Sequence, residues 1–139
     1  MTEQEKQLLL KDLCARLPYE YIKCKWIVES FNPDTFDKEL EINEVIILFI
    51  EPNKNSVHLY GKEVPVDIGE IKPYLRPMSS MTEEEKEEYE LLIDCSDYTY
   101  FKTSDKVIDW LNAHHFDYRG LINKSIAIEA PEGMYEIHT

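Results

Sequence analysis

The spacing of hydrophobic and polar positions predicts a helix, then a β-rich middle, then further helices. In residues 2–17, leucines recur near one face, which is typical of an amphipathic helix. Thr2 and Glu5 have the spacing of a capping box, in which each side chain satisfies the exposed backbone N–H of the other residue. Pro18 predicts the end of this helix, because the residue before a proline avoids the helical region.

The β-rich middle is predicted over about residues 20–68. A period of two between apolar and polar positions, typical of strands with one buried face, occurs in segments 21–28, 57–60 and 64–68. The apolar run from Val45 to Ile50 lacks this alternation and predicts a central strand covered on both faces. The turn signal Asn32-Pro33-Asp34 predicts a loop over residues 31–41. The four strands predict an antiparallel meander that stays flat or curls into a small open barrel.

Prolines shape the end of this middle and the segment after it. Pro65 has no backbone donor, so it predicts an edge position or a bulge for its strand. Pro73 and Pro77, four residues apart, exclude a regular helix and predict an extended or single-turn connector over residues 71–78. Three residues are expected to pin this connector to the core, namely Ile71, Tyr74 and Leu75.

The C-terminal part, about residues 82–123, is predicted to be helical. Thr82 and Glu85 have capping-box spacing and begin a helix that runs to about Ile93. A third helix is expected to begin at Ser104 and to fade near His114. Strands are predicted at residues 98–101 and 125–129, and the tail after them is expected to fray.

Length and composition are those of one globular domain. A chain of 139 residues with 43% hydrophobic content has the size and apolar share of a single domain. We therefore expect residues 1–139 to form one α+β domain. In it, an antiparallel β-meander or small open barrel packs with an N-terminal helix and two C-terminal helices.

The chain is strongly acidic, with a formal net charge of −13. This charge argues against direct nucleic-acid binding and against docking on anionic lipid, since both need a basic face. No apolar run approaches the roughly 20 residues of a membrane span, and the first residues lack the apolar core of a signal peptide. Cys14, Cys24 and Cys95 form no redox or zinc motif and are expected to be core thiols in a reduced compartment. The expected location is cytoplasmic.

Four segments carry a resemblance to a known family. They read MTEQEKQLLLKDLCARLPY, IKPYLRPMSSMTEEEKEEY, DWLNAHHFDYRGLI and AIEAPEGMY. Together they resemble a family of small proteins from gut Bacteroidales, linked to prophages and mobile elements, that has no established function. The resemblance covers roughly residues 1–19, 71–90 and 109–135 and implies a bacterial, phage-derived protein with no assigned activity. The middle, 20–68, lies outside it, and we hypothesise that this segment determines the choice of partner.

The densest group of side chains that could bind a ligand or take part in catalysis lies around His114 and His115. Two histidines and a carboxylate are metal ligands in principle, but adjacent helical residues point about 100° apart, so no metal site is predicted. A helix C-terminus, whose dipole favours histidine, explains the pair, and Asp117 is expected to cap the next turn. The candidate ligand or partner contacts are His114, His115, Tyr118 and Arg119.

A second candidate is an acidic helix face. Residues 83–97 hold eight acidic residues and one lysine, a net charge of −7. Such a run is usually a solvated face, but it also attracts basic partners. The members chosen as a candidate acidic face are Glu84, Glu87, Glu88 and Asp94.

Motifs of catalysis are missing from the sequence. It has no glycine-rich phosphate loop and no nucleophile elbow. The leading hypothesis is a non-catalytic cytoplasmic module, without a cofactor, that binds another protein. Two alternatives remain: an acidic DNA mimic that inhibits a host DNA-binding or defence protein, and a small enzyme or ligand-binding protein that uses the cluster from His114 to Arg119.

Overall fold

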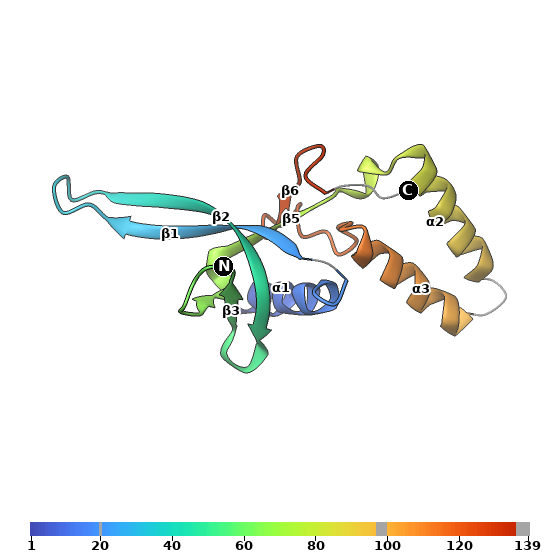
Figure 1. Cartoon of the computed structure of the whole chain (residues 1–139), viewed down its shortest axis with the longest axis horizontal. Helices are drawn as coiled ribbons and strands as arrows, with labels where there is room; N and C mark the ends of the chain where they lie inside the picture. The colour runs from blue at the N-terminus through green and yellow to red at the C-terminus, as the bar shows by residue number, and fades with distance from the viewer. Residues whose placement is uncertain (20, 97–99, 136–139) are drawn as a thin grey trace.

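The protein has a mixed α+β fold, in which three α-helices accompany a six-stranded sheet in the part of the chain that is described (Figure 1). The structure is a computed structural model that describes residues 1–19, 21–96 and 100–135, with the side chains of residues 94–104 left out. The helices and strands are α1 (Glu3–Arg16), β1 (Ile22–Phe31), β2 (Lys38–Glu51), β3 (Ser56–Leu59), β4 (Val66–Asp67), β5 (Ile71–Leu75), α2 (Glu83–Ser96), α3 (Tyr100–Ala113) and β6 (Ile128–Glu129). The predicted α+β class is confirmed.

The sheet has the strand order β4-β3-β2-β1-β5-β6, and only β5 and β6 run parallel. The first four strands form the predicted antiparallel meander. The register of β2 against β3 shifts between Ile47 and Phe49, and β2 bends strongly, so the sheet curls into an open half-barrel (Figure 1). A bulge of this kind increases local twist, which explains the curl.

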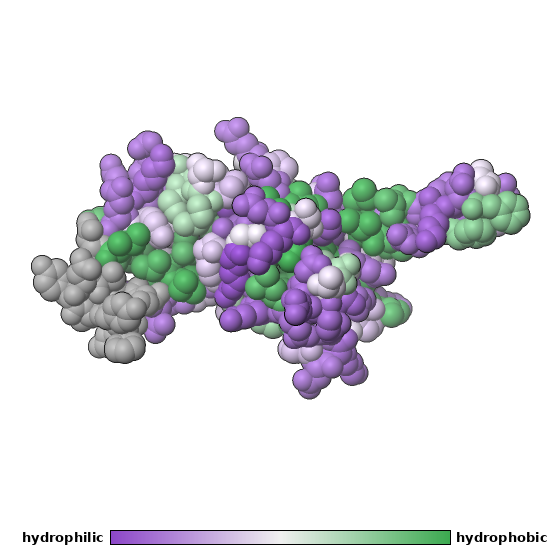
Figure 2. All heavy atoms as spheres, turned by 180° about the vertical axis from the view of Figure 1, so that it is seen from behind, coloured by the Kyte–Doolittle hydropathy of each residue, from purple (hydrophilic) through white to green (hydrophobic). Residues whose placement is uncertain are grey.

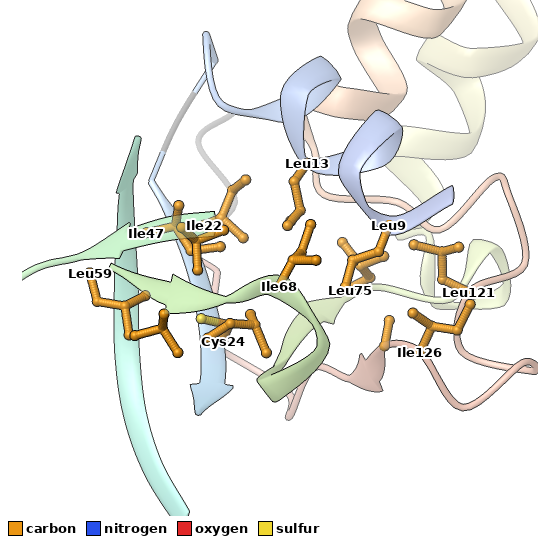
Figure 3. Packing of buried hydrophobic residues seen from close by; sticks show 14 residues of the cluster. Leu9, Leu13, Ile22, Cys24, Ile47, Leu59, Ile68, Leu75, Leu121 and Ile126 are labelled. Atoms are coloured by element: carbon orange, nitrogen blue, oxygen red, sulfur yellow. The ribbon is translucent and has the colours of Figure 1, made fainter. Parts of the chain in front are cut away.

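Helix α1 covers one face of the sheet. Its predicted capping box is present, since Thr2 N–H donates to Glu5 and Glu5 N–H donates to Thr2. Leu9 and Leu13 are fully buried on its inner face. They pack with Ile68, in the short turn between β4 and β5, and with sheet residues such as Leu75, in one apolar cluster that reaches Leu121 (Figure 3). This cluster holds the helix, the sheet and the C-terminal segment together.

Helices α2 and α3 lie side by side at one end of the sheet (Figure 1). Tyr89 and Trp110 connect them, with ring centroids 5.7 Å apart. The chain after α3 returns to β5, where Arg76 N–H donates to the His115 carbonyl over 2.8 Å. Asp117 caps the following turn as predicted, because its carboxylate accepts from two successive backbone N–H groups.

Strand β2 corrects two predictions. The predicted loop over residues 31–41 is wrong at Phe31, which is the last residue of β1. It is also wrong from Lys38 onward, because β2 begins there and the alternation over residues 39–42 continues the strand. Covering on both faces is also wrong. Leu48 and Phe49 are 43% and 51% exposed, because α1 lies on the opposite face of the sheet.

Two predicted segments of the proline-rich region, residues 64–68 and 71–78, also differ from the structure. The strand predicted over residues 64–68 is reduced to β4, which is an edge strand as Pro65 indicated. The connector predicted over residues 71–78 is extended at its start, as one of its two predicted forms, but there it is also strand β5 of the sheet, paired with β1 from Cys24 to Trp26. Its predicted core residues are buried, namely Ile71, Tyr74 and Leu75.

The C-terminal elements differ in their bounds. Helix α3 begins at Tyr100, so the predicted start at Ser104 is late and the strand predicted at 98–101 is wrong there. Residues 97–99 lie outside the described chain. The last strand is shorter than predicted, and the tail is docked as far as Tyr135. That residue is buried, and its hydroxyl donates to the Tyr74 carbonyl over 2.7 Å.

The cysteines are only partly as expected. Cys24 is a buried core residue, and burial raises the pKa of its thiol to about 12. Cys14 is exposed, which contradicts its predicted place in the core, because it lies beside the apolar stripe of α1 and not within it. The side chain of Cys95 lies outside the described part.

Candidate protein-interaction surface

Strands β1 and β2 extend beyond the body of the protein as a two-stranded hairpin (Figure 1). Strand β5 pairs with β1 only from Cys24 to Trp26, and β3 pairs with β2 only from Ile47 onward. Between these limits the hairpin strands pair with each other alone. We call residues 27–42 of this hairpin the arm.

The turn at the tip of the arm is organised by Asn32. Its Oδ1 accepts from the Asp34 N–H over 3.0 Å, and its carbonyl accepts from the Phe36 N–H over 2.9 Å. Phe36 has a φ of 59°, in the left-handed region that large side chains avoid. Its ring is 78% exposed. The tip therefore holds an aromatic ring in water at a backbone position that suits glycine or asparagine better.

One face of the arm is apolar. The register places Ile27 opposite Ile42, and it places Leu40 and Phe31 further along the same face, because directly opposed residues share a side. Phe31, Leu40 and Ile42 are 59%, 62% and 55% exposed. With Phe36, which contacts Phe31, these four form the arm's apolar face. Figure 2 shows hydrophobic residues at the base and at the tip of this projection.

The opposite face of the arm is acidic. Glu41 lies opposite Val28 and Glu39 lies opposite Ser30, so both carboxylates point to the side away from Leu40. The arm contains five acidic residues and Lys38, a net charge of −4. Lys38 pairs weakly with Glu29 over 3.9 Å on the apolar side, and both side chains are exposed. The arm thus combines an apolar surface with a negative potential.

The candidate residues around the end of α3 do not converge on one site. His114 stacks on Trp110 with ring centroids 4.2 Å apart. His115 is buried, and its ring stacks on Tyr135 at 3.7 Å. The two histidines therefore lie against different aromatic residues. This arrangement agrees with the expectation that adjacent residues at a helix end point apart.

Tyr118 and Arg119 are brought together, but with structural partners. The Arg119 guanidinium lies 4.6 Å from the centre of the Tyr118 ring. Its Nη1 donates to Asp12 over 2.8 Å, and the Tyr118 hydroxyl donates to Asn112 over 2.8 Å. Asp12 also accepts two hydrogen bonds from Arg16, and both of these residues are buried. The network ties α1 to the segment after α3.

Sequence reasoning missed Asp12 and Arg16 as members of this network. Their spacing of four residues on a helix and their position beside Leu9 and Leu13 are the signal that could have found them. A charged pair on the buried stripe of a helix needs an internal partner, and Arg119 provides it.

Among the described side chains of the acidic helix α2, one carboxylate is buried. Glu84, Glu87 and Glu88 are exposed, as expected for a solvated face. Glu88 accepts from the Trp110 indole over 3.0 Å. Asp94 belongs to α2, but its side chain lies outside the described part. Glu85 is only 3% exposed and pairs with Arg76 through two hydrogen bonds of 2.8 and 2.6 Å.

This pair lies beside a cleft of about 330 Å³, lined by residues that include Arg76, Thr82, Glu129 and Tyr135. Burial raises the pKa of Glu85. The hydrogen bonds from Arg76 and from the Thr82 backbone lower this pKa by more than burial raises it, so the pKa of Glu85 lies below its ordinary value. An ionised carboxylate held by arginine does not act as a general acid or base at neutral pH. Glu85 therefore holds Arg76 in place at the wall of this cleft.

Comparison with protein-family models, with curated proteins and with solved structures gives no match for this chain. Within the described residues, no helix has the length and apolarity to cross a bilayer. Among the same residues, no group of three or more His, Cys, Asp or Glu is placed to hold a metal ion.

Proposed function

We propose that this chain is a non-catalytic protein-interaction module that binds another protein through the apolar face of the arm. The observation that carries the proposal is the exposure of Phe31, Phe36, Leu40 and Ile42, each more than half accessible, on a hairpin that no other described element covers. The proposal keeps the expected cytoplasmic location and phage-derived origin.

Two physical costs support this proposal. An isolated two-stranded hairpin is marginally stable in water, so an arm without a third strand gains from a partner. A large apolar side chain left in water also forgoes about 1.5–3 kcal/mol of burial free energy. Four such side chains on one arm, rimmed by carboxylates, have the composition of a docking site.

The two alternative functions have weaker support. Tyr118 and Arg119 already satisfy Asn112 and Asp12, which favours a structural role for them over ligand binding. The DNA-mimic alternative rests on α2, where five carboxylates are exposed among the described side chains and one, Glu85, is buried. The α2 surface therefore receives its own variant in the test.

The test is affinity capture from a lysate of the organism that encodes the chain, read by mass spectrometry. The arm variant carries Phe36→Ser and Ile42→Ser. The matched control carries Tyr60→Ser and Val64→Ser, two apolar residues that are each 71% exposed outside the arm. A third variant carries Glu84→Gln and Glu87→Gln on α2.

A protein captured by the wild type and the control, but not by the arm variant, is the expected result. Loss from the α2 variant alone would replace the proposal with the acidic-helix alternative. The same captured proteins with all variants, or none with the wild type, would overturn the proposal. Thermal melting of each variant checks that the fold is kept, since all these side chains are exposed.

A further inference from the structure

Resting on this proposed function, we infer that the partner is an extended protein segment that adds as a new strand to the outer edge of β2, and that basic and apolar residues alternate along it. The free edge of β2 comprises Lys38–Val45. Three features of this edge carry the inference: its unpaired backbone, its side-chain alternation and its charge.

The backbone of this edge has one neighbour. From Lys38 to Val45, β2 pairs with β1 alone, and β3 joins only at Ile47. The Ile46 carbonyl already accepts from the Tyr60 N–H over 2.9 Å, which sets the inner limit. In a strand with one neighbour, alternate N–H and C=O groups face outward and can receive another strand. Eight residues exceed the length of a typical strand, so the edge can hold a complete one.

From Glu39 to Ile42 the side chains along this edge alternate in type. Glu39 and Glu41 lie on one side of the hairpin, and Leu40 and Ile42 lie on the other. Opposed residues on neighbouring strands interact, and each pair of opposite charges or of apolar residues stabilises the pairing. A segment in which lysine or arginine alternates with valine, isoleucine or leucine matches both sides at once.

The negative charge of Glu39 and Glu41 on this edge is not neutralised by a cation of the arm on the same side. Glu39 accepts from the Asn32 amide over 2.8 Å, and a neutral amide does not cancel its charge. Lys38 is the arm's one cation, and it lies beside Glu29 on the apolar side. The partner would therefore supply the opposing positive charges.

A second copy of this chain fits the edge poorly. Two arms, each with a net charge of −4, would bring Glu39 and Glu41 close to the same carboxylates of the other copy. Like charges on opposed strand positions destabilise the pairing. The whole chain, at −13, adds to the repulsion. Charge therefore selects a basic partner over self-association.

The inference is tested with synthetic peptides. The probe is a blocked ten-residue peptide of alternating lysine and valine, and its control is the same composition permuted to a helical period. At low salt, we expect the alternating peptide to bind at least tenfold more tightly than the permuted control peptide. It should also protect β2 amides between Lys38 and Val45 from hydrogen exchange. Equal binding of the two peptides, or protection on another element, would overturn the inference.

Two charge-reversal variants distinguish binding at the β2 edge from non-specific electrostatic attraction of the basic peptide. Glu39→Lys with Glu41→Lys should weaken peptide binding at least tenfold. The control variant, Asp34→Lys with Asp37→Lys, makes the same change in net charge in the exposed turn. It should change the affinity for the peptide by less than threefold. Equal losses would show long-range attraction without strand addition.

Two further controls keep the result independent of folding and of self-association. Since Glu39→Lys removes the Asn32 hydrogen bond, single Glu41→Lys is compared with single Asp37→Lys, with the same order expected. Sedimentation of the wild type without peptide should show a monomer. A dimer with protected β2 amides would contradict the inference.

Failure of this inference is distinguishable from failure of the proposed function. If Phe36→Ser with Ile42→Ser abolishes capture of the cellular partner while Glu39→Lys with Glu41→Lys does not, the arm is the docking site and strand addition is wrong. If the first variant leaves capture intact, the proposed function itself is wrong.

Discussion

Phe31 and Phe36 pack edge to face at the tip of the arm, with ring centroids 6.0 Å apart and an interplanar angle of 67°. Both rings stay more than half exposed, so this contact shields little of either one. Phe36 also occupies a left-handed backbone position. An exposed aromatic ring at a strained position has no folding benefit that explains it, which favours a role in binding.

Replacing Phe36 by asparagine is expected to separate stability from binding. Asparagine tolerates the left-handed region, so the free energy of unfolding should stay equal or rise by up to about 1 kcal/mol. Capture of the partner should be lost. Denaturant unfolding and capture are measured on the same variant. A loss of stability together with retained capture would contradict the account.

Breaking the buried pair of Arg76 and Glu85 is expected to destabilise the fold strongly. Glu85→Gln keeps the capping-box geometry with Thr82 but leaves the Arg76 charge buried without its counterion. Removing one partner of a buried pair costs about 3–5 kcal/mol. Urea unfolding at pH 7 measures this cost. An unchanged midpoint would show that the guanidinium is solvated.

The same pair predicts a pH dependence. Burial opposes ionisation of Glu85, but the Arg76 hydrogen bonds outweigh it, so the pKa in the folded state lies below the ordinary 4.5. The unfolded state then binds the proton more tightly. The stability contributed by this group is therefore present above pH 4.5 and is lost as the pH falls through the lowered pKa. Glu85→Gln should flatten this part of the stability profile, and an unchanged acid slope would contradict the assignment.

The Asp12 network is expected to dock the C-terminal segment on α1. Asp12→Asn removes the buried counterion of both Arg16 and Arg119 and should destabilise the fold by about 3–5 kcal/mol. Glu3→Gln on the exposed side of the same helix is the control and should change stability by less than about 0.5 kcal/mol. Chemical unfolding compares the two. Equal effects would refute the docking role.

Trp110 is expected to hold α2 on α3. It is half-buried, stacks on His114 and Phe116, and donates to Glu88. Trp110→Ala should cost about 3 kcal/mol, at the lower end of the range for buried aromatic residues, because one side stays accessible. Glu88→Gln isolates the indole hydrogen bond. A wild-type melting midpoint for Trp110→Ala would show that the contact is dispensable.

Local signals explain why much of the fold could be predicted. Thr2, Glu5 and Pro18 mark α1 through contacts that span a few residues. Period-two alternation likewise marks β1 and β3, which both pair with β2, a strand close to each of them in the sequence. In contrast, Ile71–Leu75 contains a proline, and its identity as a strand depends on pairing with β1 some 50 residues earlier, which no local pattern contains.

The candidate site was harder to predict for the same reason. The turn signal around Pro33 obscured the alternation from Glu39 to Ile42, although that alternation is present in the sequence. Whether a hairpin stands alone depends on where β3 and β5 join it, which is a long-range property. The arm lies inside residues 20–68, the segment hypothesised to determine partner choice. That hypothesis and the family resemblance stay predictions.

The candidate contacts at the end of α3, His114 to Arg119, were grouped in the sequence analysis for a related reason. Arg119 owes its position to Asp12, 107 residues earlier. His115 lies against Tyr135, in a tail that was expected to fray. Sequence proximity grouped these four side chains, but the tertiary structure does not bring all of them to one site.

Photo-crosslinking from the arm tests the central claim most directly. The photoreactive residue p-benzoylphenylalanine is placed at Phe36 in one chain and at Tyr60, which is similarly exposed, in another. After irradiation in host lysate, the account predicts a covalent protein adduct from position 36 that excess wild-type chain suppresses and excess Phe36→Ser, Ile42→Ser chain does not. Equal adducts from both positions, or none from position 36, would contradict it.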